Sequence, residues 1–135
     1  MTESDQESEK KAAFTWSKEQ LEVAIDELVK LGIVDGPSVE GRPAWMLPFQ
    51  VLIAELRETG QRQRALWVIS GDVPTDHIDA RLAETARDAA RYFSLKWQMH
   101  AARQAPTPGD AAIGRDLAGQ AEALNALVES DEAWK

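Results

Sequence analysis

The most informative absence in this sequence of 135 residues is cysteine. Without cysteine the chain forms no disulfide, performs no thiolate catalysis and lacks the commonest zinc ligand, and this composition fits a reducing compartment. No apolar run approaches the roughly 18 residues that a membrane helix needs. The N-terminus is polar and acidic, without the apolar segment of a secretory signal. We therefore expect a soluble, cytoplasmic protein with no membrane partner.

Familiar catalytic and phosphate-binding motifs are also missing. Neither G-x-G-x-x-G nor G-x-x-x-x-G-K-[ST] occurs, which argues against a nucleotide phosphate site. Ser70, Asp72 and His77 are the residue types of a nucleophilic triad, but they lack the G-x-S-x-G elbow and a recognisable oxyanion loop. General acid or base chemistry by Asp72 or His77 is the remaining enzymatic alternative. No cofactor is predicted, and the sequence favours a non-enzymatic protein over an enzyme.

Acidic charge, by contrast, is present in excess, with 23 Asp and Glu against 15 Lys and Arg. Residues 1–56 carry 5 basic and 11 acidic side chains, residues 57–103 carry 8 and 6, and residues 104–135 carry 2 and 6. An acidic protein repels phosphate backbones, and the mixed middle of the chain does not reverse this. Nucleic acid is therefore excluded as a partner.

The sequence divides into three segments. Residues 1–13 have nothing to bury and are predicted to be a disordered acidic tail. Residues 14–105 are predicted to form one core domain, in keeping with the length of the chain. Residues 106–135 are predicted to be a linker, beginning at Pro106-Thr107-Pro108-Gly109, and a C-terminal helix. Whether that helix docks on its own domain stays open.

Apolar spacing predicts helices over residues 17–31, 86–104 and about 111–129. The first has a capping box from Ser17 and a C-terminal Gly32. Thr85 is the predicted N-cap of the second. The second helix carries a stripe wide enough for packing on two sides, formed by Ala86, Ala89, Ala90, Tyr92, Phe93, Leu95, Trp97, Met99 and Ala101.

A small antiparallel sheet is predicted as a hairpin of residues 49–57 and 64–70, joined by a loop around Gly60. Residues 66–69 are all apolar, which predicts a strand buried on both faces. Residues 49–57 are also compatible with a helix. The predicted fold is therefore α+β, a single domain in which the hairpin packs against three helices.

Turn signals are present at Asp35-Gly36-Pro37-Ser38 and at Gly41-Arg42-Pro43. The tryptophans, together with Phe49 and Phe93, are expected to build the core. Trp45 and Trp134 are the two that we expect to reach the surface as interface residues.

The run Trp67-Val68-Ile69-Ser70-Gly71-Asp72-Val73-Pro74-Thr75-Asp76-His77-Ile78, with Arg87 and Phe93-Ser94-Leu95-Lys96-Trp97 after it, resembles an uncharacterised family of small bacterial proteins. That family bears a W-V-I-S-G-D-[LV]-P-T-D-[YH]-I signature and is labelled a domain of unknown function. The resemblance covers about residues 42–100, including Arg42-Pro43-Ala44-Trp45-Met46-Leu47-Pro48, and implies no activity. His77 stands where Tyr is common, which argues against a catalytic phenol or an obligatory imidazole there.

Asp72, Asp76, His77 and Asp79 are four possible ligands for a divalent cation within one turn. The spacing is not that of an EF-hand. The simpler interpretation is that Asp72 and Asp76 accept hydrogen bonds from backbone amides of the turn and that Asp79 caps a helix. No metal site is therefore predicted. A small-ligand site at this turn would be formed by Ser70, Asp72, Thr75, Asp76, His77, Arg87 and Arg91.

Arg87 and Arg91 contribute to that site because they are four residues apart on one helix face and could clamp a carboxylate or phosphate. Pairing with Glu84, Asp88 or the acidic termini is the simpler interpretation.

These observations predict a non-enzymatic protein-interaction domain of the bacterial cytoplasm, with a protein partner. An immunity or regulatory role fits this composition, although no residue selects it. The alternative is a small-ligand or divalent-metal binding protein, or an enzyme, acting at the turn 70–79. The sequence does not determine the oligomeric state.

Overall fold

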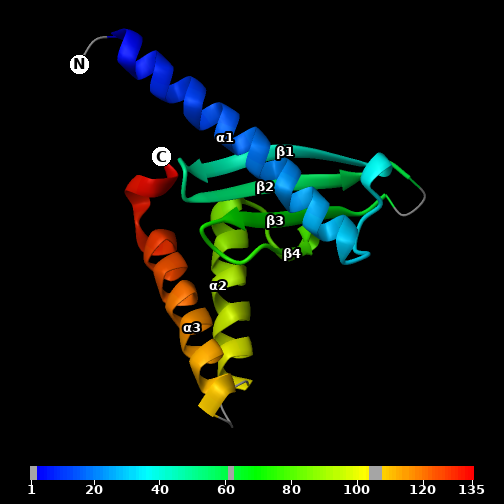
Figure 1. Ribbon diagram of the computed structural model, residues 1–135, viewed down its shortest axis with the longest axis vertical. Coiled ribbons are helices and arrows are strands. Elements are labelled where there is room, and N and C mark those ends of the chain that lie inside the picture. Colours follow the sequence, from blue (N-terminus) through cyan, green and yellow to red (C-terminus); the bar gives the residue numbers. More distant parts are fainter. Residues whose placement is uncertain (1–2, 61–62, 104–107) are drawn as a thin grey trace. The chain divides into compact units, whose positions relative to one another are not determined.

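Figure 1 shows a computed structural model of the chain, which contains α-helices and antiparallel strands. The structure describes residues 3–60, 63–103 and 108–135, with side chains at residues 5–60, 63–103 and 116–135. The predicted α+β class is confirmed: the described residues form three α-helices and a four-stranded antiparallel sheet. The chain divides into two compact units, residues 1–80 and 81–135. The division between a core domain over 14–105 and an appended segment over 106–135 stays a prediction.

The sheet lies in the first unit, and its strands are neighbours in chain order. Each pairs antiparallel with the next. The strands are β1 (Val39–Leu47), β2 (Val51–Glu58), β3 (Ala65–Gly71) and β4 (Asp76–Asp79). The predicted hairpin is β2 and β3, in which Ala54 faces Val68. The strand interpretation of residues 49–57 is therefore correct and the helix interpretation is wrong.

The outer strands β1 and β4 correct the sequence analysis, which expected two strands. Gly41-Arg42-Pro43 lies within β1, not in a turn. β1 is an edge strand, and an edge strand tolerates proline because the missing N–H need not bond to a neighbouring strand. The register of β1 and β2 shifts just after Pro43. A Cβ on Gly41 would lie 2.8 Å from a Leu56 methyl and 3.1 Å from a Leu21 methyl. Glycine therefore permits the close packing at this point of the edge strand.

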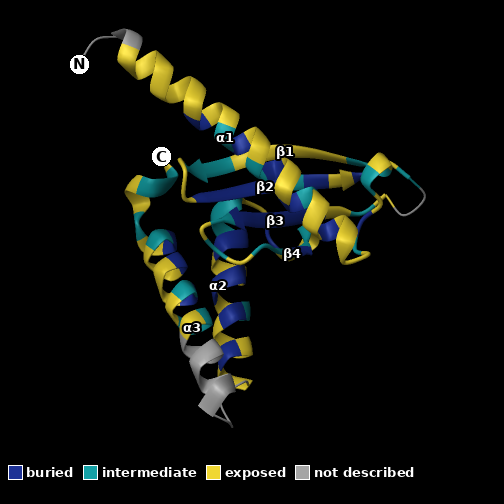
Figure 2. Ribbon diagram, viewed as in Figure 1, coloured by how far each residue is buried: buried dark blue, intermediate teal, exposed yellow. Residues whose placement is uncertain are grey.

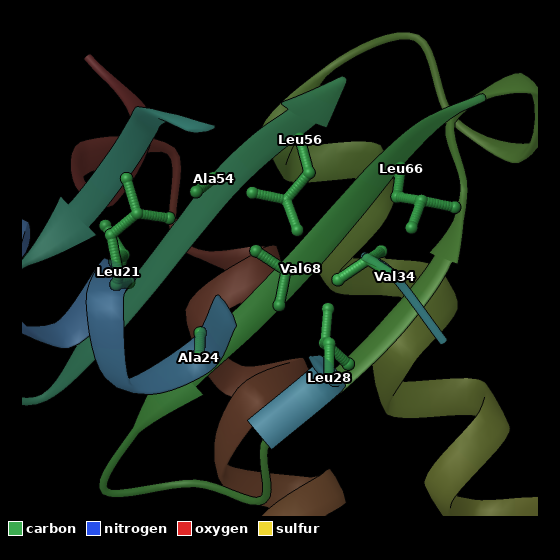
Figure 3. Packing of buried hydrophobic residues seen from close by; sticks show 9 residues of the cluster. Leu21, Ala24, Leu28, Val34, Ala54, Leu56, Leu66 and Val68 are labelled. Atoms are coloured by element: carbon green, nitrogen blue, oxygen red, sulfur yellow. The ribbon is translucent and has the colours of Figure 1, made fainter. Parts of the chain in front are cut away.

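Helix α1 (Glu3–Lys30) packs over one face of the sheet. Its apolar stripe contacts the alternate residues of β2 and β3 that point to the same side (Figure 3). This buried cluster consists of Leu21, Ala24, Leu28, Val34, Leu52, Ala54, Leu56, Leu66 and Val68. Gly32, with φ +74°, follows the helix, as predicted for its C-terminal residue.

The described part of residues 1–13 is helical from Glu3 onward, where the sequence analysis expected disorder. Residues 5–12 are exposed, so burial does not explain the helix (Figure 2). Helix propensity does, because this stretch is rich in Glu, Lys and Ala, and its first carboxylates complement the helix dipole. The helix predicted over residues 17–31 thus corresponds to the C-terminal part of a longer helix.

Strand β3 is buried on both faces, as predicted. Leu66 and Val68 belong to the cluster under α1, and the alternate residues Trp67 and Ile69 are 4% and 0% exposed. Val51 and Ile53 of β2 are buried in the same way.

The second unit contains α2 (Ala86–Arg103) and α3 (Pro108–Glu129), which pack against each other. Thr85 caps α2 as predicted, since the Asp88 N–H donates to Thr85 Oγ1 at 3.1 Å. Ser94 Oγ donates to the Ala121 carbonyl oxygen at 2.8 Å across the helix pair. Pro106 and Thr107, the predicted start of the linker, lie outside the described residues.

The prediction that α2 packs on two sides is wrong for part of its stripe. Phe93 and Trp97 are buried, but Tyr92, Leu95 and Met99 are exposed. The remaining short elements are 3-10 helices at Gly36–Ser38, Ala80–Leu82 and Asp131–Trp134. Within the described part of the chain, no helix combines the length and apolarity required to cross a membrane.

Candidate functional site

The predicted turn starts at Ser70, whose side chain is buried near the end of β3. Gln20 of α1 donates from Nε2 to Ser70 Oγ at 2.8 Å. Ser70 Oγ and Thr75 Oγ1 share a second hydrogen bond of 2.9 Å. One buried hydroxyl therefore ties α1, the end of β3 and the approach to β4 together.

Gly71 and Asp72 bind the neighbouring hairpin turn through the backbone. The Asp72 N–H donates to the Gln50 carbonyl oxygen at 2.7 Å. Gly71 has φ +125°, and a Cβ there would lie 2.3 Å from the same Gln50 oxygen. This approach admits no side chain, so glycine is required at position 71.

Asp72 is exposed, whereas Asp76, His77 and Asp79 are half-buried in or beside β4. Asp76 Oδ1 accepts a hydrogen bond of 2.8 Å from the His77 N–H, which is the local role that the simpler interpretation gave to Asp76. Among the described residues, no three His, Asp or Glu side chains gather in a way that could hold a metal ion. The four candidates thus share a segment without forming a set of ligands.

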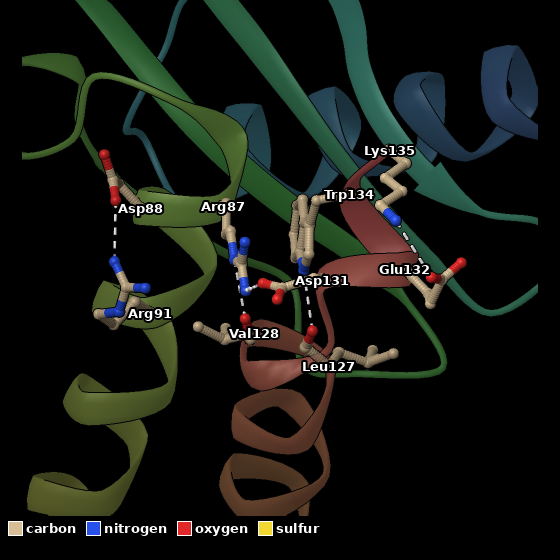
Figure 4. Close-up of polar contacts among 9 residues, drawn as sticks. All are labelled: Arg87, Asp88, Arg91, Leu127, Val128, Asp131, Glu132, Trp134 and Lys135. Atoms are coloured by element: carbon tan, nitrogen blue, oxygen red, sulfur yellow. Dashed lines mark hydrogen bonds and ion pairs between the residues drawn. The ribbon is translucent and has the colours of Figure 1, made fainter.

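The two arginines of the predicted ligand clamp have separate internal partners (Figure 4). Arg87 donates from Nε to the Val128 carbonyl oxygen and from Nη2 to Asp131 Oδ1, both at 2.8 Å. Its cation thus lies at the C-terminal end of α3, where the helix dipole favours it. Arg91 pairs with Asp88 at 2.8 Å. The structure therefore places Arg87 as a helix cap, and the clamp stays a prediction.

The two predicted interface tryptophans are both half-buried. Trp134 donates from Nε1 to the Leu127 carbonyl oxygen at 2.8 Å and fastens the end of the chain to α3 (Figure 4). Trp45 lies on β1, where it pairs with Ile53 of β2. Their role at an interface stays a prediction.

Phe49 is expected in the core, but the structure exposes it, and it precedes Gln50, which binds the turn 70–79. We call the turn 70–79 the signature turn. The Phe49 side chain is 53% exposed. Phe49 occupies the third position of the turn between β1 and β2, which is closed by the Gln50 N–H donating to the Leu47 carbonyl oxygen at 2.9 Å. With Pro48 before it and φ +64°, this position resembles that of a type II turn, where glycine or asparagine is usual. A bulky residue there is an outlier.

Phe49 makes a ring contact with Trp16 of α1, with centroids 5.9 Å apart and planes inclined by 52°. We call Trp16 and Phe49 the aromatic pair. The signature turn binds a neighbour of each ring. Gln20, one helical turn after Trp16, donates a hydrogen bond to Ser70. Gln50, which follows Phe49, accepts a hydrogen bond from the Asp72 N–H. The signal that could have revealed the pair is Pro48-Phe49, a turn dipeptide in which Phe replaces the expected glycine.

Comparison with known proteins supports an uncharacterised domain family, which is the coarser part of the resemblance noted in the sequence. No curated protein and no solved structure matches the chain. A family described as a domain of unknown function matches residues 9–134, which is most of the chain and wider than the segment carrying the resemblance. The chain therefore belongs to the family of the domain of unknown function DUF4826.

Proposed function

We propose that this chain is a non-enzymatic protein-interaction domain that contacts a basic protein through the aromatic pair. The observation that carries the proposal is Phe49, which combines φ +64° with a ring that is 53% exposed. Left-handed backbone costs a residue with a Cβ about 1–2 kcal/mol, and a ring that is half exposed offsets this cost only in part. Strained backbone that displays an aromatic side chain is characteristic of binding surfaces.

The rigidity around the pair supports the same proposal. The hydrogen bonds from Gln20 to Ser70 and from Asp72 to Gln50 fix the two segments that carry the rings. An anchor that is already held in place loses little conformational entropy when it binds. The signature turn thus acts as the support of a contact surface rather than as a ligand site.

The charge of the first unit supports a basic partner. Residues 1–80 contain 15 acidic and 8 basic side chains. On α1, which carries Trp16, the exposed acidic residues include Glu19, Glu22 and Asp26. Such a surface attracts a basic protein, accelerates its association and repels phosphate backbones.

We extend the proposal to a bacterial cytoplasmic protein with an immunity or a regulatory role. The support is the resemblance to a bacterial family and a sequence without cysteine, which is compatible with a reducing compartment. Both roles need a protein partner and no catalytic group.

Photo-crosslinking in the native host tests the contact directly. Benzoylphenylalanine replaces Phe49 in one variant and Leu31, which is 66% exposed at the end of α1, in a control variant. We expect covalent adducts with a basic protein from position 49 and none from position 31. Equal adducts from both positions would contradict the proposal, since they would report general surface encounters.

The captured partner then allows a quantitative test. Trp16→Ala and Phe49→Gly are expected to weaken its binding at least about tenfold, the effect of losing a hot-spot residue, whereas Leu31→Ala leaves it unchanged. Higher salt is expected to slow association, because the attraction is electrostatic. Unchanged affinity in a folded Phe49→Gly variant would overturn the proposal.

A further inference from the structure

We infer that a second copy of this chain docks on the exposed face of α2, forming an antiparallel two-fold dimer. The inference concerns residues 81–135 and does not depend on the aromatic pair. It begins with one line of side chains, which we call the α2 stripe: Asp88, Tyr92, Leu95, Met99 and Arg103. Successive members are three or four residues apart, close to the roughly 3.6 residues of a helical turn, so they lie along one face of α2.

The apolar middle of the stripe is open. Leu95 and Met99 are each 54% exposed, and Tyr92 is 37% exposed. The buried residues of α2, such as Phe93 and Trp97, are at other positions of the helix. Neighbouring exposed apolar side chains on one helix face mark an interaction surface.

The order of chemistry along the stripe selects the partner. The stripe is acidic at Asp88, apolar in the middle and basic at Arg103. When a second α2 runs antiparallel with the two Leu95 side chains adjacent, Asp88 of each copy faces Arg103 of the other. Tyr92 likewise faces the Met99 of the second copy. A parallel arrangement would oppose like charges at both ends, which disfavours it. The stripe is therefore self-complementary in the antiparallel sense, as an isologous interface requires.

A groove beside the stripe gives the Met99 of the second copy a place to lie. It is an open depression of about 450 Å³ at the Asp88 end of α2 and is lined by Leu82, Tyr92 and Leu95 among others. A methionine side chain is flexible enough to fill an irregular groove, and its sulfur makes favourable contacts with an aromatic ring. The two-fold axis provides two such contacts for each dimer.

Asp88 already pairs with Arg91 at 2.8 Å, as Figure 4 shows. The two side chains are 44% and 55% exposed, and ion pairs so open to water contribute little. A carboxylate has acceptor capacity for a second cation, so Asp88 can bind the Arg103 of the other copy without losing Arg91. Five side chains are fewer than a stable interface uses, so we expect a weak, reversible dimer.

Sedimentation velocity of the full chain over a range of concentrations tests the dimer. We expect the fraction of dimer to rise with concentration. Leu95→Glu would place two carboxylates side by side on the two-fold axis, and we expect the dissociation constant to rise at least about tenfold. Leu31→Glu is the matched control, an exposed leucine in the other unit, and should leave the constant unchanged. Circular dichroism verifies that both variants fold.

The orientation can be tested because the chain contains no cysteine. Asp88→Cys and Arg103→Cys variants are prepared separately, mixed and mildly oxidised. The antiparallel dimer predicts disulfides mainly between the two different variants, whereas a parallel dimer predicts links between identical ones. A chain that stays monomeric, a dimer insensitive to Leu95→Glu, or a preference for links between identical variants would each overturn the inference.

Discussion

At the scale of single residues, Phe49 shows how a local pattern and a distant contact combine. Pro48 pre-sets the turn, but the third position then requires a positive φ that phenylalanine adopts only with strain. Its ring neighbour, Trp16, comes from another element. Because strain and ring contact oppose each other, the net contribution of Phe49 to folding should be small, even though its ring is large.

Phe49→Gly is therefore expected to change the free energy of unfolding by no more than about 1 kcal/mol. Relief of about 1–2 kcal/mol of left-handed strain offsets about 0.5–1 kcal/mol of glycine entropy and about 0.5–1.5 kcal/mol of lost ring contact. Phe93→Ala is the contrast, because Phe93 is 0% exposed and its removal should cost about 3–5 kcal/mol. Urea denaturation of both variants measures the difference. A loss near that of Phe93→Ala would place the Phe49 ring in the core instead.

Gly71 offers a second prediction at this scale. Gly71→Ala forces a Cβ to within 2.3 Å of the Gln50 carbonyl oxygen and strains a φ of +125°. We expect a loss of roughly 3 kcal/mol or more from the combined clash and strain. Gly32→Ala is the control, since Gly32 has φ +74° with no atom within 4 Å of the added Cβ. That variant carries only the strain, about 1 kcal/mol, so equal losses in thermal melts would refute this account of Gly71.

Residues whose role is local could be predicted from the sequence, and residues whose role is distant could not. Thr85 and Gly32 act on the helix beside them, so spacing alone identified both. Ser70 was found as part of the turn, but its partner Gln20 lies 50 residues away in the chain. No pattern in one sequence reports such a pairing. The aromatic pair escaped prediction for the same reason.

At the scale of elements, the buried strands could be predicted from their apolar runs, whereas the edge strands of the sheet could not. The hairpin of β2 and β3 was readable because both strands are buried and a short loop containing Gly60 joins them. β1 and β4 are edge strands, which are more open to solvent, and their composition reflects this exposure more than their pairing with a neighbouring strand. The N-terminal extension of α1 could not be predicted from apolar spacing, because its residues are exposed and helix propensity alone is sufficient there.

The Arg87 side chain joins two elements, because it extends from α2 and donates hydrogen bonds at the C-terminal end of α3. Arg87→Lys keeps the charge but cannot reproduce two bonds in a fixed fork to the Val128 carbonyl and Asp131. We expect a loss of about 1–2 kcal/mol. Arg91→Lys alters only an exposed ion pair within one helix and should stay within about 0.5 kcal/mol. Comparable urea midpoints for the two variants would show that Arg87 is an ordinary surface residue.

At the scale of the whole molecule, acidic charge and function class are linked. The charged groups that could have served catalysis or metal binding in the described turn are separated or bonded within the chain. The first unit also carries acidic residues at exposed positions, and in the proposed function this charge favours the approach of a basic protein. The proposed binding role relies on this acidic surface, and a ligand site at the turn is the competing proposal.

Thermal unfolding with and without divalent cations separates these two statements. A ligand at 100 times its dissociation constant stabilises the native state by about 2.7 kcal/mol, which raises the midpoint of a domain of this size by several degrees. We expect Mg²⁺, Ca²⁺, Mn²⁺ and Zn²⁺ each to leave the midpoint within about 1 °C of its value without cation. Asp76→Ala should lower the midpoint equally in both conditions, because it removes interactions within the chain, among them the hydrogen bond from the His77 N–H. A rise with one cation that disappears in Asp76→Ala would instead make the turn a metal site, and its carboxylates would then act on a ligand rather than on their own backbone.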